Sequence, residues 1–122
     1  MTKRKGKYRI CKTGYTFSSA HHLNMGQRSN HKCSQMHGHN YRVDIVMEGK
    51  LDKFGMVKDF GNFQDLLWVM GSLDHCNLND TIAQPTAEHL AKHIFDWAKP
   101  RHKELVSVKV WETPNCWAEY SE

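Results

Sequence analysis

The chain has 122 residues, of which 39% are hydrophobic and 25% charged, and its formal net charge is +4. This length fits one domain with a modest core, and no stretch is long and apolar enough to cross a membrane. A basic balance suits a nucleic acid or a polyanionic small molecule, and charge alone does not choose between them. Residues 1–7 are basic and lack the apolar run of a signal peptide, so we expect a flexible tail, a single domain over residues 8–122 and a cytoplasmic location.

The cysteine and histidine content favours free thiols and a histidine-based site. The four cysteines, Cys11, Cys33, Cys76 and Cys116, form no C-x-x-C pair, and nothing in the sequence suggests secretion. We therefore expect reduced thiols rather than a disulfide framework. Nine histidines are a high count for this length and are the first indication of function.

Two strands are predicted in the first third of the chain. Residues 8–22 carry β-forming residues in partial alternation, with Gly14 as a possible bend or bulge. Residues 24–34 are polar and without periodicity, which indicates a loop. The alternation over residues 37–48 is regular and predicts a strand. The residues expected on one of its faces are His37, His39, Tyr41, Val43, Ile45 and Met47.

Two helices are predicted next. Asp59 can cap the first helix, and Gly71 is expected to end it. The apolar stripe expected on this helix is Phe60, Phe63, Leu67 and Met70. Thr86 is expected to cap the second helix, and Pro100 to stop it. The stripe expected on this second helix is Ala87, Leu90, Ala91, Ile94, Phe95 and Ala98.

Two further strands complete the predicted order β-β-α-α-β-β. Residues 105–112 alternate, and residues 116–120 are expected to form the last strand. The side chains expected on the inward face of the first of these strands are Val106, Val108, Val110 and Glu112. Segregated strands and helices indicate an α+β fold, with a four-stranded antiparallel sheet and two helices on one face. Such a sheet has two open edges, which oligomerisation often closes.

The strongest local indication of function is the pair His37 and His39, which one residue separates. Residues i and i+2 of a strand point to the same side, so both imidazoles can reach one metal ion. His21, at the end of the first strand, is the best candidate for a third ligand. Three neutral imidazoles suit Zn²⁺ and leave a fourth position open, as in a catalytic site. The alternative is that the pair simply faces the core or solvent.

Other candidate residues flank this pair, and each has a structural alternative. Cys33 could be a fourth metal ligand, a reactive thiolate near the metal, or a small buried hydrophobe. Asp74 next to His75 can hold an imidazole for proton transfer, although the dipeptide also occurs on ordinary surfaces. Glu112 lies at the end of an apolar strand face, where a carboxylate needs a partner such as the N–H edge of a ligand, unless the strand end frays into solvent.

Five ordered segments resemble the 6-pyruvoyl-tetrahydropterin synthase family. They are residues 17–21 (FSSAH), 33–40 (CSQMHGHN), 73–79 (LDHCNLN), 85–88 (PTAE) and 111–113 (WET). The resemblance runs from about Tyr8 to Tyr120. Three residues separate Cys33 from His37, a gap similar to that of the bacterial 6-carboxy-5,6,7,8-tetrahydropterin synthase branch, usually called QueD, of the queuosine pathway.

This resemblance implies residue roles and an architecture. The implied zinc ligands are His21, His37 and His39, the implied catalytic residues are Cys33, Asp74 and His75, and the implied substrate-binding residues are Glu112, Thr86 and Glu88. The implied architecture is the tunnelling fold (T-fold), in which trimers close a β-barrel and two trimers form a homohexamer. The implied substrate is a small molecule, 7,8-dihydroneopterin triphosphate.

The carboxy branch would convert this substrate to 6-carboxy-5,6,7,8-tetrahydropterin with release of acetaldehyde and triphosphate. A 6-pyruvoyl-tetrahydropterin synthase activity on the same substrate is the alternative. Phosphate contacts could come from Arg28, His31 and Lys32, although solvated loop charges are the plainer interpretation. A zinc-stapled basic module that binds nucleic acid would instead need Cys33 as a fourth ligand, and the chain lacks the paired Cys/His knuckles of such modules, so no nucleic-acid partner is expected.

Overall fold

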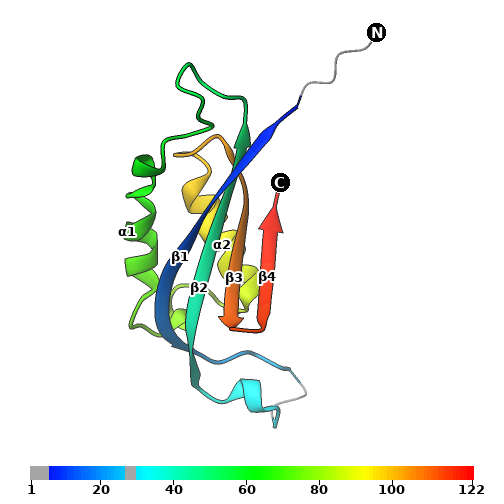
Figure 1. Cartoon of the computed structure of the whole chain (residues 1–122). Coiled ribbons are helices and arrows are strands. Elements are labelled where there is room, and N and C mark those ends of the chain that lie inside the picture. The colour runs from blue at the N-terminus through cyan, green and yellow to red at the C-terminus, as the bar shows by residue number, and fades with distance from the viewer. Residues whose placement is uncertain (1–5, 27–29) are drawn as a thin grey trace.

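The computed structural model describes residues 6–26 and 30–122 and confirms the predicted order of strands and helices. The basic residues before Gly6 and the loop residue Arg28 lie outside the described residues. The elements are β1 (Tyr8–His21), η1 (Lys32–Ser34), β2 (His37–Gly49), η2 (Phe60–Phe63), α1 (Leu66–Leu73), η3 (Leu78–Asp80), α2 (Ala87–Ala98), β3 (Leu105–Thr113) and β4 (Cys116–Ser121). The strands pair antiparallel in the order β1-β2-β3-β4, and both helices cover one face of the sheet (Figure 1).

A bulge in β1 decides which of its residues face the helices. Ile10 pairs with Met47 on the helix side, whereas after the bulge it is Tyr15 that pairs with Val43 on that side. The irregularity lies between Lys12 and Tyr15 and includes Gly14, whose φ of +90° suits glycine. One extra residue shifts the side-chain alternation from even to odd positions. The predicted bulge at this glycine is therefore confirmed.

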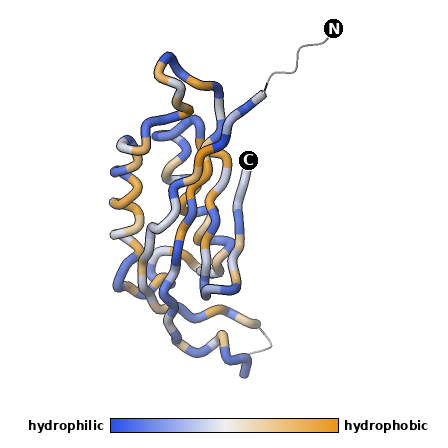
Figure 2. Tube along the Cα trace, in the orientation of Figure 1, coloured by the Kyte–Doolittle hydropathy of each residue, from blue (hydrophilic) through white to orange (hydrophobic). Residues whose placement is uncertain are grey.

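The core fills the space between the sheet and the helices. Figure 2 shows hydrophobic residues gathered along the middle of the sheet, with hydrophilic segments at its ends. The buried strand residues that face the helices include Tyr15, Phe17, Tyr41, Val43, Ile45, Met47, Val108 and Val110. This set agrees with the face predicted for residues 37–48. The stripe predicted for α2 is also confirmed, because all six of its members are buried.

The first helix differs from its prediction. Asp59 caps the short 3-10 helix η2 through the N–H of Gly61, and the α-helix begins only at Leu66. The tighter 3-10 turn rotates the following residues, so Leu67 is 57% exposed rather than buried. The residues that face the core are Phe63, Leu66, Val69, Met70 and Leu73. Gly71 lies inside α1 and does not end it.

The prediction for β3 is wrong at one position. Val106 is only partly buried, and Leu105 takes its place in the core. The pairing of β2 with β3 shifts between Val46 and Met47, which leaves Val106 as the extra residue of a bulge. Within the part of the chain that the structure describes, no helix is long and apolar enough to span a membrane. All four cysteines are free.

Candidate metal centre and active site

Three histidines from β1 and β2 converge on one point. His21 pairs with His37 in the β1–β2 register, and His39 lies two residues further along the same face of β2. One ring nitrogen from each of the three residues lies within 4.8 Å of the others, and His21 is fully buried. The bulge at Gly14 places His21, rather than His22, on this face. The predicted trio is therefore brought together in a single chain and is close enough to hold a metal ion.

The outer nitrogens of two of these rings are fixed by backbone carbonyls. His21 Nδ1 lies 2.7 Å from the carbonyl oxygen of Pro85, and His37 Nδ1 lies 2.8 Å from that of Gln35. A carbonyl only accepts, so each Nδ1 carries the hydrogen and each Nε2 presents a lone pair. These two Nε2 atoms lie 3.0 Å apart, where lone pairs repel unless they share a cation.

This donor set fits a small, borderline-soft metal ion. Zn–N distances of about 2.0–2.1 Å place two nitrogens of a tetrahedral site about 3.3 Å apart. Burial lowers the pKa of His21, and burial also lowers that of His39 despite the nearby Glu112 carboxylate. The neutral imidazole is the form that binds metal. The site therefore favours the protonation state that a metal ion requires.

Glu112 lies beside this centre. Its Oε1 atom is 3.4 Å from His39 Nε2 and 3.7 Å from His21 Nε2. The carboxylate thus points to the helix side of the sheet, as the alternation of β3 predicts. It adds negative charge next to the three histidines, and its side chain keeps 31% exposure, so a ligand can reach it.

Cys33 lies apart from the histidine group. It sits half-buried in the short helix η1, and its sulfur is not among the ligand atoms that cluster in the described residues. Its backbone N–H donates to His31 Nδ1, and its carbonyl accepts from the N–H of Leu23 at 2.7 Å. A closed four-ligand site that includes this thiol is therefore absent from the described part of the chain.

Asp74 and His75 form a hydrogen-bonded pair on the outer edge of β1. Asp74 Oδ2 lies 2.7 Å from His75 Nδ1, while its Oδ1 accepts the N–H of Ser18 at 2.8 Å. The bond from the Ser18 N–H, followed by that from His75, lowers the pKa of Asp74 below its ordinary value. His75 has a φ of +52° and a side chain that is 83% exposed. The pair therefore presents an oriented imidazole to solvent.

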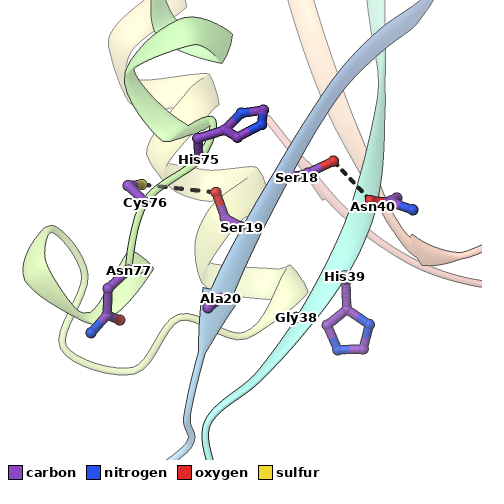
Figure 3. A pocket seen from close by; sticks show the side chains of 9 residues that line it. All are labelled: Ser18, Ser19, Ala20, Gly38, His39, Asn40, His75, Cys76 and Asn77. Atoms are coloured by element: carbon purple, nitrogen blue, oxygen red, sulfur yellow. Dashed lines mark hydrogen bonds between the residues drawn. The ribbon is translucent and has the colours of Figure 1, made fainter.

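His75 of this pair borders an open cleft of about 540 Å³. Figure 3 shows His75 on the loop beside β1, with His39 and Asn40 across the cleft on β2. Ser18 donates its hydroxyl to Asn40 Oδ1 at 2.7 Å, so these two side chains form part of the polar wall. No role was predicted for either residue, although both lie within the ordered segments that the sequence singles out. The cleft is thus lined by β1, by β2 and by the loop that carries His75.

Thr86 and Glu88 lie at the start of α2, directly after the carbonyl that binds His21. Thr86 accepts the N–H of His89 at 3.1 Å, which confirms its predicted capping role. Glu88 is exposed in the first turn of the helix, where a negative charge is favourable. Of the predicted phosphate-binding residues, Lys32 is exposed and His31 caps η1.

Comparisons with known proteins identify relatives along most of the chain. The sequence profile of the family described as 6-pyruvoyl tetrahydropterin synthase matches residues 9–122. A protein of Rickettsia bellii named 6-carboxy-5,6,7,8-tetrahydropterin synthase is 31% identical over 137 aligned positions, which cover 89% of this chain and 97% of the relative. The relative of that name from Haemophilus influenzae is 29% identical, with 88% and 95% covered.

Solved structures show the same fold. The 6-pyruvoyl tetrahydropterin synthase of Caenorhabditis elegans superposes with a TM-score of 0.85, 26% identity and 99% of each chain covered. The Plasmodium falciparum structure of that name, at 18% identity and a TM-score of 0.75, supports the fold alone. The predicted tunnelling-fold arrangement of the single chain is thus confirmed. A profile match over nearly the whole sequence shows that the chain belongs to the 6-pyruvoyl tetrahydropterin synthase family.

Proposed function

We propose that this protein is a Zn²⁺-dependent carbon–carbon lyase that converts 7,8-dihydroneopterin triphosphate and one water molecule to 6-carboxy-5,6,7,8-tetrahydropterin, with release of acetaldehyde and triphosphate. The observation that carries the proposal is the facing pair of nitrogens, His21 Nε2 and His37 Nε2, at 3.0 Å. Relatives named for this activity support the choice of reaction. When bound, Zn²⁺ would act as a Lewis acid on the side-chain oxygens of the substrate.

The residues around the centre would move protons and hold the ring. Cys33 as a thiolate would take and return a proton at a side-chain carbon of the pterin. His75, oriented through its Nδ1 by Asp74, would exchange protons through the exposed Nε2. Glu112 would accept two N–H bonds from the guanidine-like edge of the pterin, a charge-assisted pairing. Thr86 and Glu88 would line the pterin pocket at the start of α2.

A homo-oligomer follows from the same proposal. No hydrogen bond or ion pair joins Cys33 to Asp74 or His75 within the described chain, although the proposed chemistry uses all three. The sheet also ends in two edge strands, β1 and β4, and among the described residues β1 is bonded on its outer side only near its C-terminal end. We propose that trimers close these edges into a barrel and that two trimers form a hexamer, acting in the cytoplasm in a queuosine or related deazapurine pathway.

The test is to incubate the Zn²⁺-loaded protein with 7,8-dihydroneopterin triphosphate. Acetaldehyde is measured by a coupled dehydrogenase assay, and the pterin product by its mass. The expected result is equal amounts of acetaldehyde and the carboxypterin. A pyruvoyl product without acetaldehyde would reassign the protein to the pyruvoyl reaction, which its likeness to the C. elegans enzyme favours. If the substrate remains unchanged, the proposed function is wrong.

A nucleic-acid module stapled by zinc is the distant alternative. It requires a closed site with Cys33 as a ligand, whereas the clustered ligand atoms of the described residues are all from histidine. Binding of single-stranded RNA that weakens steeply with salt would support this alternative. We expect no such binding.

A further inference from the structure

Beyond the end of β1, two side-chain amides hold the extended residues 22–24. Asn79 Oδ1 accepts the N–H of His22, and Asn79 Nδ2 donates to the carbonyl of His22, both at 2.9 Å. Gln84 repeats this arrangement on Asn24. Its Oε1 accepts the N–H of Asn24 at 2.8 Å, and its Nε2 donates to the carbonyl of Asn24 at 3.0 Å.

Each carboxamide takes the place of a neighbouring strand. A side-chain amide offers one carbonyl and N–H donors, the same groups that a peptide unit offers. Nearer the middle of β1, the bonds on this side of the strand are between backbone groups. The Ser18 carbonyl accepts the N–H of His75, and the N–H of Ala20 donates to the carbonyl of Cys76. From Asn79 onward, side chains supply the bonds. Residues 75–84 thus form one continuous support along β1 and its extension.

The backbone of residues 22–24 connects the two amides to Cys33, because its hydrogen-bonding groups point alternately to opposite sides. In a strand, the N–H and C=O of one residue point to one side and those of the next residue to the other. His22 and Asn24 therefore face the amides, and Leu23 faces away from them. On that opposite side, the N–H of Leu23 donates to the carbonyl of Cys33 at 2.7 Å. Residues 22–24 therefore lie between the two side-chain amides and the backbone of Cys33.

The same support also touches the histidine centre. Pro85, next to Gln84, accepts the hydrogen bond from His21 Nδ1. The bonds from the N–H groups of Cys33 and Ser34 to His31 are local to the cysteine turn. The bond from Leu23 therefore links the cysteine turn to a part of the domain that also orients a candidate metal ligand.

We propose that Asn79 and Gln84 are positioning residues that set the place of Cys33 relative to the histidine centre. Within the described residues, the side-chain hydrogen bonds of Asn79 and Gln84 go to the backbone of His22 and Asn24, so each acts through residues 22–24. The consequence for catalysis rests on the proposed function, in which Cys33 transfers protons. The positioning itself can be measured without any turnover.

The test replaces each amide by an apolar side chain of similar shape, Asn79→Leu and Gln84→Met. The matched controls are Asn62→Leu and Gln64→Met, at exposed residues whose side chains make no comparable backbone pair within the described residues. The full chain with added Zn²⁺ is treated with iodoacetamide, and alkylation of Cys33 is followed by peptide mass. Cys116, an exposed thiol in the same molecule, is the internal reference.

We expect the ratio of Cys33 to Cys116 alkylation rates to rise about 2- to 10-fold in both amide variants, because the lost pairs loosen the half-buried cysteine turn. The controls should keep the wild-type ratio. An unchanged ratio in a folded variant would overturn the proposal, and so would an equal rise at both thiols, which indicates general loosening. If Asn79→Leu does not fold, Gln84→Met alone decides.

Turnover provides the second readout. If the wild-type protein is active, kcat should fall in both amide variants more than KM rises, because the thiol is displaced while the pterin-binding groups stay. If the wild-type protein shows no synthase activity, the proposed function fails, whereas the alkylation ratio still decides whether Asn79 and Gln84 position Cys33.

Discussion

The histidine centre and the Asp74–His75 pair are built in different ways. His21 is fully buried, and strand pairing places it against His37 with both outer nitrogens bound to backbone carbonyls. The side chain of His75 is 83% exposed and lies on a loop that is bonded to the edge of β1. The difference shows that one chain fixes the candidate metal ligands through its sheet, whereas the candidate proton-transfer groups depend on loops and face outward.

Removal of one histidine of the centre should have the largest effect. We expect His37→Ala to weaken Zn²⁺ binding by more than about 100-fold, since two imidazoles hold the ion far less well than three. Competition with a chromophoric chelator measures the affinity. His75→Ala is the contrasting variant, and its affinity should stay within about threefold of wild type. Equal losses in the two variants would contradict the separation between the centre and the exposed pair.

Removal of the thiol should affect turnover and spare the metal. For Cys33→Ala we expect kcat to fall by about 10²- to 10⁴-fold, the usual contribution of a positioned acid or base. Zn²⁺ content, measured by atomic absorption after gel filtration, should match wild type. A variant that loses its metal would show that the sulfur is a ligand of the histidine centre.

The bulge in β1, which places His21 in the histidine centre, depends on the backbone conformation of Gly14. A Cβ on Gly14 would meet no atom within 4 Å, so Gly14→Ala should cost only the strain of a φ of +90°, about 1–2 kcal/mol of unfolding free energy. Urea denaturation measures it. Gly71→Ala, inside α1 and also without a close neighbour, is the matched control. It should stabilise the protein by up to about 1 kcal/mol.

Replacement of Asp74 in the exposed pair should have the smallest effect on stability, and only in one pH range. The Ser18 N–H and His75 lower the pKa of Asp74 below 3.8, so the carboxylate stabilises the folded state above that pH and the contribution is lost as the pH falls through the lowered value. Thermal unfolding should therefore separate wild type from Asp74→Asn at pH 6, and the two should approach each other toward pH 3. A difference that grows on acidification would contradict this sign.

The strand and helix periodicities of the sequence determined much of the molecule. A period of two placed His37 and His39 on one face of β2, and the stripe of α2 agreed with burial at every position. The first helix could not be derived so well, because the switch from a 3-10 turn to an α-helix between Phe63 and Leu66 rotates its buried face. Local patterns suffice where one regular element continues without interruption.

Tertiary structure decided the rest. The bulge at Gly14 selects His21 rather than His22, and its effect depends on the pairing with β2. The roles of Asn79 and Gln84 appear only when these residues, 57 and 60 positions from the residues that they bind, come to lie beside the end of β1. Hydrogen bonds between distant segments leave no periodic trace in a sequence, because any polar side chain at either position looks like an ordinary loop residue until the fold brings the two together.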